Sequence, residues 1–369
     1  MMGAPARRTR VLIVDDSAVM RSLLRSVVSA DAQLEIAGTA VDGAAALQSI
    51  VTAMPDVMLL DVEMPVMDGL ATLKRLRADG CRLPVIMCSA LTQRGARVTI
   101  EALANGAGDY VAKPDAQDSR EAAIRTLSCQ LLPRIHALVR RTQAQVLTGV
   151  PPVRPVAARA QEPRAPAVVA IGVSTGGPEA LETLLRSIPG EFPLPILIVQ
   201  HMPALFTGML AERLDKCCSL RVREAAEGMA VTAGNIYIAR GDLHMEALKP
   251  AAAGNSPTLH LTSGPPENHC RPAVDVLFRS LGATYAGNVL AVVLTGMGYD
   301  GLAGCRVLYE QGATVLVQDE ATSTVWGMPG AVATAGLAHR VLPLTEIAPE
   351  ILRLATTRSR EAFMLQEPV

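Results

Sequence analysis

Residues 171–181 read IGVSTGGPEAL, and they join two patterns of different period. The apolar run VVAIGV leads into this segment and is typical of a buried strand, whereas PEALETLLRSI, which leads out, has the spacing of a helix. A strand, a glycine-rich turn and a helix in succession indicate an α/β fold. Two functions are open for the turn. Ser174 is a nucleophile, or Gly172, Gly176 and Gly177 form a phosphate cradle in which the serine is only a small residue.

The same alternation continues through the second half of the chain. It predicts strands at 168–174, 196–202, 235–240, 289–295 and 313–320, and helices at 178–188, 204–215, 272–282 and 302–312. Continuous apolar strands with helices between them are typical of a parallel sheet that is covered on both faces. We therefore expect a doubly wound α/β domain in this half.

The first half has the same kind of organisation, although no sequence repeat relates the two halves. It predicts strands at 11–16, 34–40, 57–62, 85–90 and 109–114, with helical patterns between them such as 17–30 and 69–80. We expect a second parallel sheet, built from these strands.

Polar residues stand where the strands of the first half end. Asp15 and Asp16 end one strand, and Asp61, Ser89 and Lys113 end three others. Ligands bind at the carboxyl edge of such sheets, so these side chains should converge. Close carboxylates repel one another unless a cation lies among them, and magnesium favours oxygen ligands. A carboxylate beside magnesium and lysine can accept a phosphoryl group. Solvated strand ends are the alternative for each residue alone, but their coincidence favours a site.

The motifs VLIVDDSAVMR, LLDVEMPVMDGL, MCSA and DYVAKP resemble the receiver domain of two-component response regulators over about residues 9–115. The resemblance implies a flavodoxin-like fold with a five-stranded parallel sheet, phosphorylation of Asp61, and a histidine kinase as phosphodonor. It also implies that Asp15 and Asp16, together with Asp61, bind Mg²⁺ and that Ser89 and Lys113 contact the phosphoryl group.

An amphipathic helix is predicted after this domain. Its apolar stripe consists of Ile124, Leu127, Leu131, Ile135, Leu138 and Val139. The segment 148–167, TGVPPVRPVAARAQEPRAPA, then lacks any apolar period and is rich in Pro, Ala and Arg. We interpret it as a semi-extended linker between two domains.

Two motif patterns compete for the second half. GVSTG fits the nucleophile elbow G-x-S-x-G, and GMGYDG at 296–301 fits the dinucleotide fingerprint G-x-G-x-x-G, with Asp319 near the distance of a ribose-binding acid. We reject the dinucleotide interpretation because Asp300 would place a carboxylate where the pyrophosphate sits. The motif also lies near the chain end, without a second βαβ half after it.

A serine nucleophile needs a base and an acid. Of the six histidines, His201 ends the strand that follows Ser174 and therefore lies at the same sheet edge. The chain order Ser174, Asp300, His339 is the alternative, because a triad is defined by geometry rather than by order. We favour His201, since His339 falls in a turn before a short terminal strand. His136, on the helix before the linker, is expected to be structural or exposed.

The segments GVSTGGPEAL, VQHMPALFTGMLAERLD, IYIARGDLH, HCRPAVDVLFRSL, VLTGMGYDGLAG and VQDEATSTVWGMPGAV resemble the catalytic domain of the chemotaxis methylesterase (CheB) family, over about residues 167–354. The resemblance implies a Ser174–His201–Asp300 triad, an oxyanion donor at the Met297 backbone N–H, and Thr175 lining the site. An N-cap role alone is the alternative for Thr175.

The activity implied by the resemblance is that of a serine carboxylic-ester hydrolase without a metal in this half. It hydrolyses glutamate γ-methyl esters on methyl-accepting chemotaxis receptors, and many members of the family also deamidate receptor glutamines. Three positions call for comment. Arg240 replaces a proline common in the family, Cys270 separates His269 from Arg271 without an assignable function, and Trp326 serves either core packing or the receptor cleft.

Composition narrows the remaining choices. A net charge of −1 indicates neither nucleic acid nor an anionic membrane as a partner. Seven cysteines without a C-x-x-C pair indicate reduced thiols. The short N-terminal apolar run and the lack of a spanning stretch predict a cytoplasmic protein without membrane insertion. We expect a monomer.

The expected organisation is a receiver at 9–120, a helix and linker at 121–166, a catalytic domain at 167–355 and a tail at 356–369. We expect the unphosphorylated receiver to block the Ser174 cleft and phosphorylation of Asp61 to relieve this block. A signalling module with a degenerate esterase half and an esterase for small molecules are the competing hypotheses.

Overall fold

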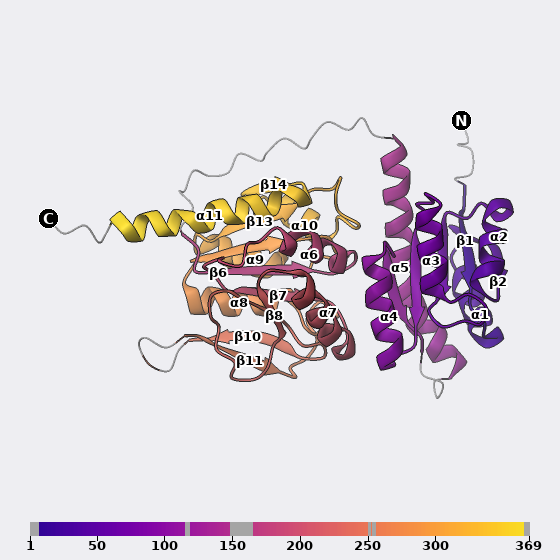
Figure 1. The fold of residues 1–369 in the computed structure, drawn as a ribbon, viewed down its shortest axis with the longest axis horizontal. Helices are drawn as coiled ribbons and strands as arrows, with labels where there is room; N and C mark the ends of the chain where they lie inside the picture. Colours follow the sequence, from indigo (N-terminus) through magenta and orange to yellow (C-terminus); the bar gives the residue numbers. More distant parts are fainter. Residues whose placement is uncertain (1–6, 115–118, 148–164, 250–251, 253–255, 365–369) are drawn as a thin grey trace. The chain divides into compact units, whose positions relative to one another are not determined.

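The computed structural model describes residues 7–114, 119–147, 165–249, 252 and 256–364 (Figure 1). The chain divides into two compact units, Met1–Gly149 and Val150–Val369. Nearly all of the predicted linker lies outside the described residues, as does the end of the predicted tail. No helix in the described part of the chain is both long enough and apolar enough to cross a membrane.

The first unit contains a parallel sheet of five strands in the order β2-β1-β3-β4-β5. The strands are β1 (Thr9–Val14), β2 (Leu34–Ala40), β3 (Val57–Asp61), β4 (Val85–Ser89) and β5 (Asp109–Ala112). This is the flavodoxin-like order, so the predicted fold of this unit is confirmed. β3 and β4 are buried along their whole length, as expected for strands covered on both faces.

The helices between these strands begin at polar side chains that accept backbone N–H groups. The helices are α1 (Ala18–Ser29), α2 (Gly43–Ala53), α3 (Gly69–Ala78) and α4 (Gln93–Ala104), and their N-caps are Ser17, Asp42, Asp68 and Thr92. Each cap satisfies a donor that would otherwise lack a partner in the first helical turn. The caps therefore fix where each strand-to-helix loop ends. These loops lie at the carboxyl edge of the sheet.

The helix α5 (Arg120–Leu147) confirms the predicted amphipathic stripe. Leu127, Leu131 and Ile135 are at most 1% exposed and belong to the same apolar cluster as residues of β1, β3 and α1. The helix thus packs on the core of the first unit. Its Pro133 lies inside the helix.

The second unit contains a parallel sheet of seven strands in the order β14-β13-β12-β6-β7-β9-β8. The strands are β6 (Val168–Val173), β7 (Ile196–Gln200), β8 (Arg221–Glu224), β9 (Asn235–Ile238), β12 (Val289–Val293), β13 (Thr314–Gln318) and β14 (Arg340–Leu342). The chain moves outward from β6 to one side and then returns to β12 on the other side. The predicted doubly wound fold is confirmed, and β6 lies at its switch point.

Helices pack on both sides of this sheet, in separate groups. One group is α6 (Gly177–Arg186), α7 (Ala204–Cys217) and α11 (Leu344–Met364), and the other is α8 (Val274–Tyr285), α9 (Leu302–Glu310) and α10 (Met328–Thr334). Successive side chains of a strand face opposite sides of a sheet. Accordingly, Val168 and Ala170 of β6 share an apolar cluster with Phe278 of α8.

Several elements of the second unit were not predicted from sequence. They are β8, the helices α10 and α11, and the antiparallel pair β10 (His244–Leu248) and β11 (Thr258–Thr262), which packs against α8. The helix α11 extends into the segment expected as a tail. The unpredicted strands are short, and β8 has the burial pattern of a half-exposed edge, so their apolar pattern is weak.

Gly241 controls the start of α7, the helix that begins just after His201. A Cβ on Gly241 would lie 2.1 Å from Ala204 N and 2.2 Å from Pro203 C, which are backbone atoms with little freedom to move. Its own N–H donates to Thr207 Oγ1 at 3.0 Å. The loop from His201 to the start of α7 therefore packs against Gly241, where any larger residue would clash with its backbone.

We predict that Gly241→Ala lowers the free energy of unfolding of the second unit by about 1–3 kcal/mol because of overpacking. Gly208→Ala is the matched control. Gly208 lies inside α7, and the nearest atom to its added Cβ would be 3.6 Å away. Gly208→Ala should therefore stabilise the unit by up to about 1 kcal/mol, because alanine favours the helix more than glycine does. Urea unfolding followed by the fluorescence of Trp326, the only tryptophan, measures both. Equal unfolding midpoints for the two variants would contradict the prediction.

Candidate functional site

The carboxyl edge of the first sheet brings the predicted acidic residues and lysine together. Lys113 Nζ lies 2.8 Å from Asp15 Oδ2 and 2.8 Å from Asp61 Oδ1. Asp16 is exposed, yet one of its carboxylate oxygens lies within 4.8 Å of those of Asp15 and Asp61. Ser89 is fully buried at the end of β4, where its hydroxyl donates to the carbonyl of the next residue. All five predicted side chains therefore follow the strands that the sequence indicated.

The charges of this cluster fit a divalent cation. Burial raises the pKa of Asp61 to about 6, and the negative charge of Asp15 adds to this effect, while Lys113 offsets it in part. Asp15, Asp16 and Asp61 would carry more negative charge than one lysine can balance. Oxygen donors at this spacing suit Mg²⁺, which would reduce the repulsion between them.

In the second unit, Ser174 lies in the turn between β6 and α6, where neighbouring segments hold its backbone. Its N–H donates to the Thr295 carbonyl after β12 at 3.0 Å. Its carbonyl accepts from the Gly177 N–H at 2.8 Å and from Gln200 Nε2, at the end of β7, at 3.0 Å. Because β12, β6 and β7 are adjacent, Ser174 lies at the centre of this sheet edge.

The glycines around Ser174 leave space that the protein fills with its own side chains. An added Cβ would lie 2.4 Å from Val274 Cγ1 at Gly172, 2.2 Å from Thr324 Oγ1 at Gly176 and 1.9 Å from Gln200 Oε1 at Gly177. Gly176 also has a φ of 78°, which favours glycine. These glycines serve packing and the tight turn, and the filled space argues against a phosphate cradle.

The loop after β12 approaches Ser174 closely. A Cβ on Gly296 would lie 2.8 Å from Ser174 Cβ. Met297, the expected oxyanion donor, follows directly and is half-buried. Thr175 is buried, and the N-cap of α6 is Gly176 rather than Thr175, so the N-cap alternative for Thr175 is wrong.

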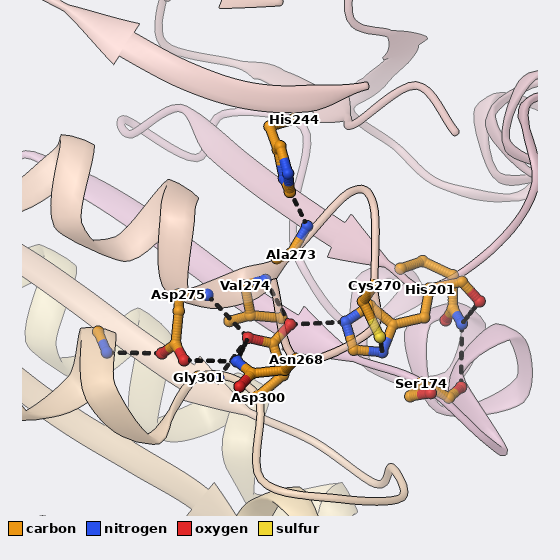
Figure 2. A network of polar contacts seen from close by, with 12 residues as sticks. Ser174, His201, His244, Asn268, Cys270, Ala273, Val274, Asp275, Asp300 and Gly301 are labelled. Carbon is orange, nitrogen blue, oxygen red and sulfur yellow. Dashed lines mark hydrogen bonds and ion pairs between the residues drawn. The ribbon is translucent and has the colours of Figure 1, made fainter. Parts of the chain in front are cut away.

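His201 and Asp300 form a hydrogen-bonded pair beside Ser174. His201 Nε2 lies 2.8 Å from Asp300 Oδ2, and Asp300 is only 2% exposed. Figure 2 shows Asp300 to the left of the His201 ring, and Ser174 below His201 on the right of the view. With Nε2–H donating to the carboxylate, the lone pair of the neutral imidazole is on Nδ1. That atom is the one able to accept a proton from a hydroxyl group.

Asp300 accepts further hydrogen bonds from the surrounding chain (Figure 2). The donors are Val274 N at 2.6 Å, Asp275 N at 3.1 Å, Gly301 N at 3.0 Å and Asn268 Nδ2 at 2.9 Å. The first two are the N-terminal residues of α8, where a helix favours negative charge. Asp300 is the carboxylate that argued against a dinucleotide site in the sequence. In the structure it lies at the N-terminus of α8, not at that of α9, the helix that follows it in the chain.

Asn268 and Asp275 are part of this network and were not singled out from sequence. Asn268 Nδ2 also donates to Asp275 Oδ2 at 2.8 Å, and Gly304 N donates to Asp275 Oδ1 at 2.6 Å. Asn268 has a φ of 52°, which asparagine tolerates better than most residues. The only sequence signal for this network was the acidic Asp275 near the start of the helix predicted at 272–282, and nothing in the sequence connected it to Asp300.

The pKa values of the pair follow from their contacts. Burial alone would raise the pKa of Asp300, but the hydrogen bonds and charge of His201 lower it below its ordinary range. Burial alone would lower the pKa of His201, yet the hydrogen bonds to Asp300 and Cys270 raise it to about 9. Burial raises the pKa of the neighbouring Asp275.

Cys270, which had no assignable function from sequence, lies against the other ring nitrogen of His201. Its Sγ is 3.6 Å from His201 Nδ1, and the residue is half-buried. The thiol is therefore in contact with the nitrogen whose lone pair would accept a proton from Ser174.

Other histidines have partners elsewhere. His339 Nδ1 accepts from Val315 N at 3.0 Å, and its ring packs on Tyr309 at 5.2 Å, so the alternative triad would have to break these contacts. His136 Nε2 lies 2.7 Å from Asp31 Oδ2, which gives it the expected structural contact.

Trp326 is half-buried and has packing contacts in the second unit. Its Nε1 donates to the Gln318 carbonyl at 2.9 Å, and its ring lies against Gly330, where an added Cβ would be 2.9 Å from Cε3. Arg240 is exposed, and nothing in the structure assigns it a role.

Comparison with known proteins gives two family matches. The model of CheB methylesterase matches residues 169–351, and that of the response regulator receiver domain matches residues 11–125. A protein-glutamate methylesterase/protein-glutamine glutaminase of Nocardioides sp. is 49% identical over 93% of this chain and 94% of its own length. A protein of the same name from Trichodesmium erythraeum is 47% identical over 93% and 98%. The solved CheB methylesterase catalytic domain of Thermotoga maritima is 40% identical, with a TM-score of 0.49, and covers 51% of this chain and 98% of that chain.

We predict that the imidazole of His201 titrates near pH 9, measured by NMR of the histidine side chains in chelator-treated buffer. Cys270→Ala should move this midpoint downward, because the protonated ring donates its Nδ1–H to the Cys270 sulfur, and the substitution removes this contact. His339 is the internal control, since burial lowers its pKa and the substitution should leave it unchanged. A His201 midpoint below that of His339 would contradict the prediction.

Proposed function

The chain belongs to the family of CheB methylesterases with a response regulator receiver domain, and on this premise we propose that it hydrolyses glutamate γ-methyl esters on methyl-accepting chemotaxis receptors. The relatives carry the name protein-glutamate methylesterase/protein-glutamine glutaminase, which describes a hydrolase. The observation that supports the proposal most strongly is the 2.8 Å hydrogen bond between His201 and the buried Asp300, beside the turn of Ser174.

The proposed reaction starts from the neutral ring of His201, the form favoured above the pKa of about 9. Ser174 Oγ attacks the ester carbonyl carbon while its proton passes to His201 Nδ1. Asp300 holds the ring through Nε2 and stabilises the imidazolium. The bond from the acyl carbon to the methoxy oxygen then breaks, and methanol leaves with the proton from Nδ1. Water, deprotonated by the same nitrogen, hydrolyses the acyl-enzyme to glutamate and restores the Ser174 hydroxyl.

The developing negative charge on the carbonyl oxygen needs donors. The proposed donor is the Met297 N–H, in the loop that packs on Ser174, with Thr175 lining the site. The N–H of Gly177 at the start of α6 already donates to the Ser174 carbonyl, so it contributes to the turn rather than to an oxyanion site.

Deamidation of receptor glutamines follows from the same chemistry. The acyl-enzyme is identical, and ammonia replaces methanol as the leaving group. Its departure also requires a proton from His201 Nδ1. We therefore expect both activities to depend on the same Ser174, His201 and Asp300.

The first unit supports regulation by phosphorylation. We infer that Asp61 accepts a phosphoryl group from a histidine kinase, that Asp15, Asp16 and Asp61 hold Mg²⁺, and that Lys113 and Ser89 contact the group. When bound, the ion would offset the charge of the transferring phosphoryl group. The 2.8 Å ion pair keeps Lys113 beside the accepting carboxylate before transfer.

We predict that Ser174→Ala abolishes methanol release from methylated receptor membranes, with a loss of roughly 10³-fold or more, because no other hydroxyl replaces the nucleophile. Ser187→Ala, at the C-terminal end of α6, is the matched control and should retain wild-type release. Release from the Ser174 variant at the wild-type rate would refute the nucleophile. Release of methanol from small esters but not from receptors by the wild type would instead favour the small-molecule esterase.

We predict that Asp61→Asn removes the stimulation of methanol release by Mg²⁺ and a small-molecule phosphodonor, while release without the phosphodonor persists. Asparagine keeps the size of the side chain but cannot form the acyl phosphate. Asp79→Asn, an exposed residue paired with Arg75, should respond to the phosphodonor like the wild type. Equal stimulation of the Asp61 variant would exclude this residue as the phosphorylation site.

A further inference from the structure

Cys270 contacts His201 in the second unit but has no role in the proposed reaction. Among the residues that the structure describes, two groups of three side chains bring possible metal-ligand atoms within 4.8 Å of one another. One is the acidic group of the first unit. The other is His201, Cys270 and Asp300.

The separation of two donor atoms in this group fits a tetrahedral zinc ion. Zinc binds histidine nitrogen at about 2.0 Å and cysteine sulfur at about 2.3 Å, so two such donors at the tetrahedral angle are about 3.5 Å apart. His201 Nδ1 and Cys270 Sγ are 3.6 Å apart. A zinc ion could therefore bridge them without rearrangement of the backbone.

The third member of the group orients the histidine rather than binding the ion. Metal-binding histidines commonly donate their other ring N–H to a carboxylate, which fixes the tautomer and the ring orientation. Asp300 does this at Nε2, on the far side of the ring from Cys270. Its oxygens are already used by Val274 N, Asp275 N and Asn268 Nδ2. Asp300 thus leaves Nδ1 as the ligand atom.

We propose that His201 Nδ1 and Cys270 Sγ form an inhibitory binding site for Zn²⁺. Binding releases the thiol proton to solvent, because the thiolate is the ligand. The metal occupies the lone pair of Nδ1 that Ser174 needs, so the serine cannot be deprotonated. Water fills the remaining positions of the ion, which makes the site reversible.

The site is accessible, and the chain offers a competing thiol pair as a control. The His201 side chain is 12% exposed and Cys270 is half-buried, so an ion can reach both. Cys217 and Cys218, at the end of α7, have sulfurs 4.0 Å apart and also resemble a soft-metal site. In the part of the chain that the structure describes, the contacts of these two thiols include no histidine, whereas Cys270 contacts His201 Nδ1.

The first test measures Zn²⁺ binding to the full chain by competition with a chromogenic zinc chelator, in excess Mg²⁺ to occupy the acidic group. We expect Cys270→Ser to weaken binding at least about 10-fold, as for loss of a thiolate ligand. A Cys217→Ser, Cys218→Ser double variant should bind as the wild type does. Equal affinity in Cys270→Ser, or loss of binding in the double variant, would overturn the site. Circular dichroism confirms that each variant is folded.

The second test measures activity, and only this readout rests on the proposed function. Zn²⁺ should inhibit methanol release by the wild type, and a chelator should restore it. Cys270→Ser, compared with its own zinc-free rate, should resist inhibition at the same concentration. Equal inhibition of both would overturn the proposal. Ser174→Ala should bind Zn²⁺ as the wild type does. If the wild type releases no methanol but Cys270→Ser still has a weaker affinity for zinc, the proposed function fails and the zinc site stands.

Discussion

The second unit depends on one buried carboxylate. Asp300 is 2% exposed, and burial of an unpaired carboxylate would cost several kcal/mol. The start of α8, the amide of Asn268 and the ring of His201 together provide the compensating donors. Each of them is also positioned by this carboxylate. The start of α8, the loop after β12 and the end of β7 are therefore tied to one point, and the ring of His201 has one orientation.

Each unit places an acidic residue at the carboxyl edge of its own parallel sheet, but the pKa values of the two residues are shifted in opposite directions. In the first, burial and the negative charge of Asp15 raise the pKa of Asp61 to about 6, and Lys113 offsets this only in part. In the second, Asp300 has donors around it, and its pKa is lowered. A clustered acid attracts a cation and a phosphoryl group, whereas a carboxylate satisfied by fixed donors stays charged and orients a base. The neighbours, rather than the fold, separate the two chemistries.

The sequence predicted those side chains that directly follow strongly apolar strands. Ser174, His201, Asp61 and Lys113 are of this kind, because strand ends meet at one edge of a parallel sheet. Asn268 and Cys270 are not. They lie in a loop between β11 and α8, where Asn268 and His269 have positive φ and no periodicity marks the path. Their contact with Asp300 and His201 exists only after the chain has folded, so no local pattern could reveal it.

Two donors compete for one lone pair at the centre of this site. Nδ1 of the neutral His201 can accept from the Cys270 thiol or from a serine hydroxyl, but not fully from both. A thiol is a weak donor, so a hydroxyl can displace it at low cost. A thiolate bound to a metal is different, because the ion occupies the lone pair itself. Cys270 is thus compatible with a serine nucleophile as a neutral thiol, and the same 3.6 Å contact becomes an obstacle only when a soft cation enters it.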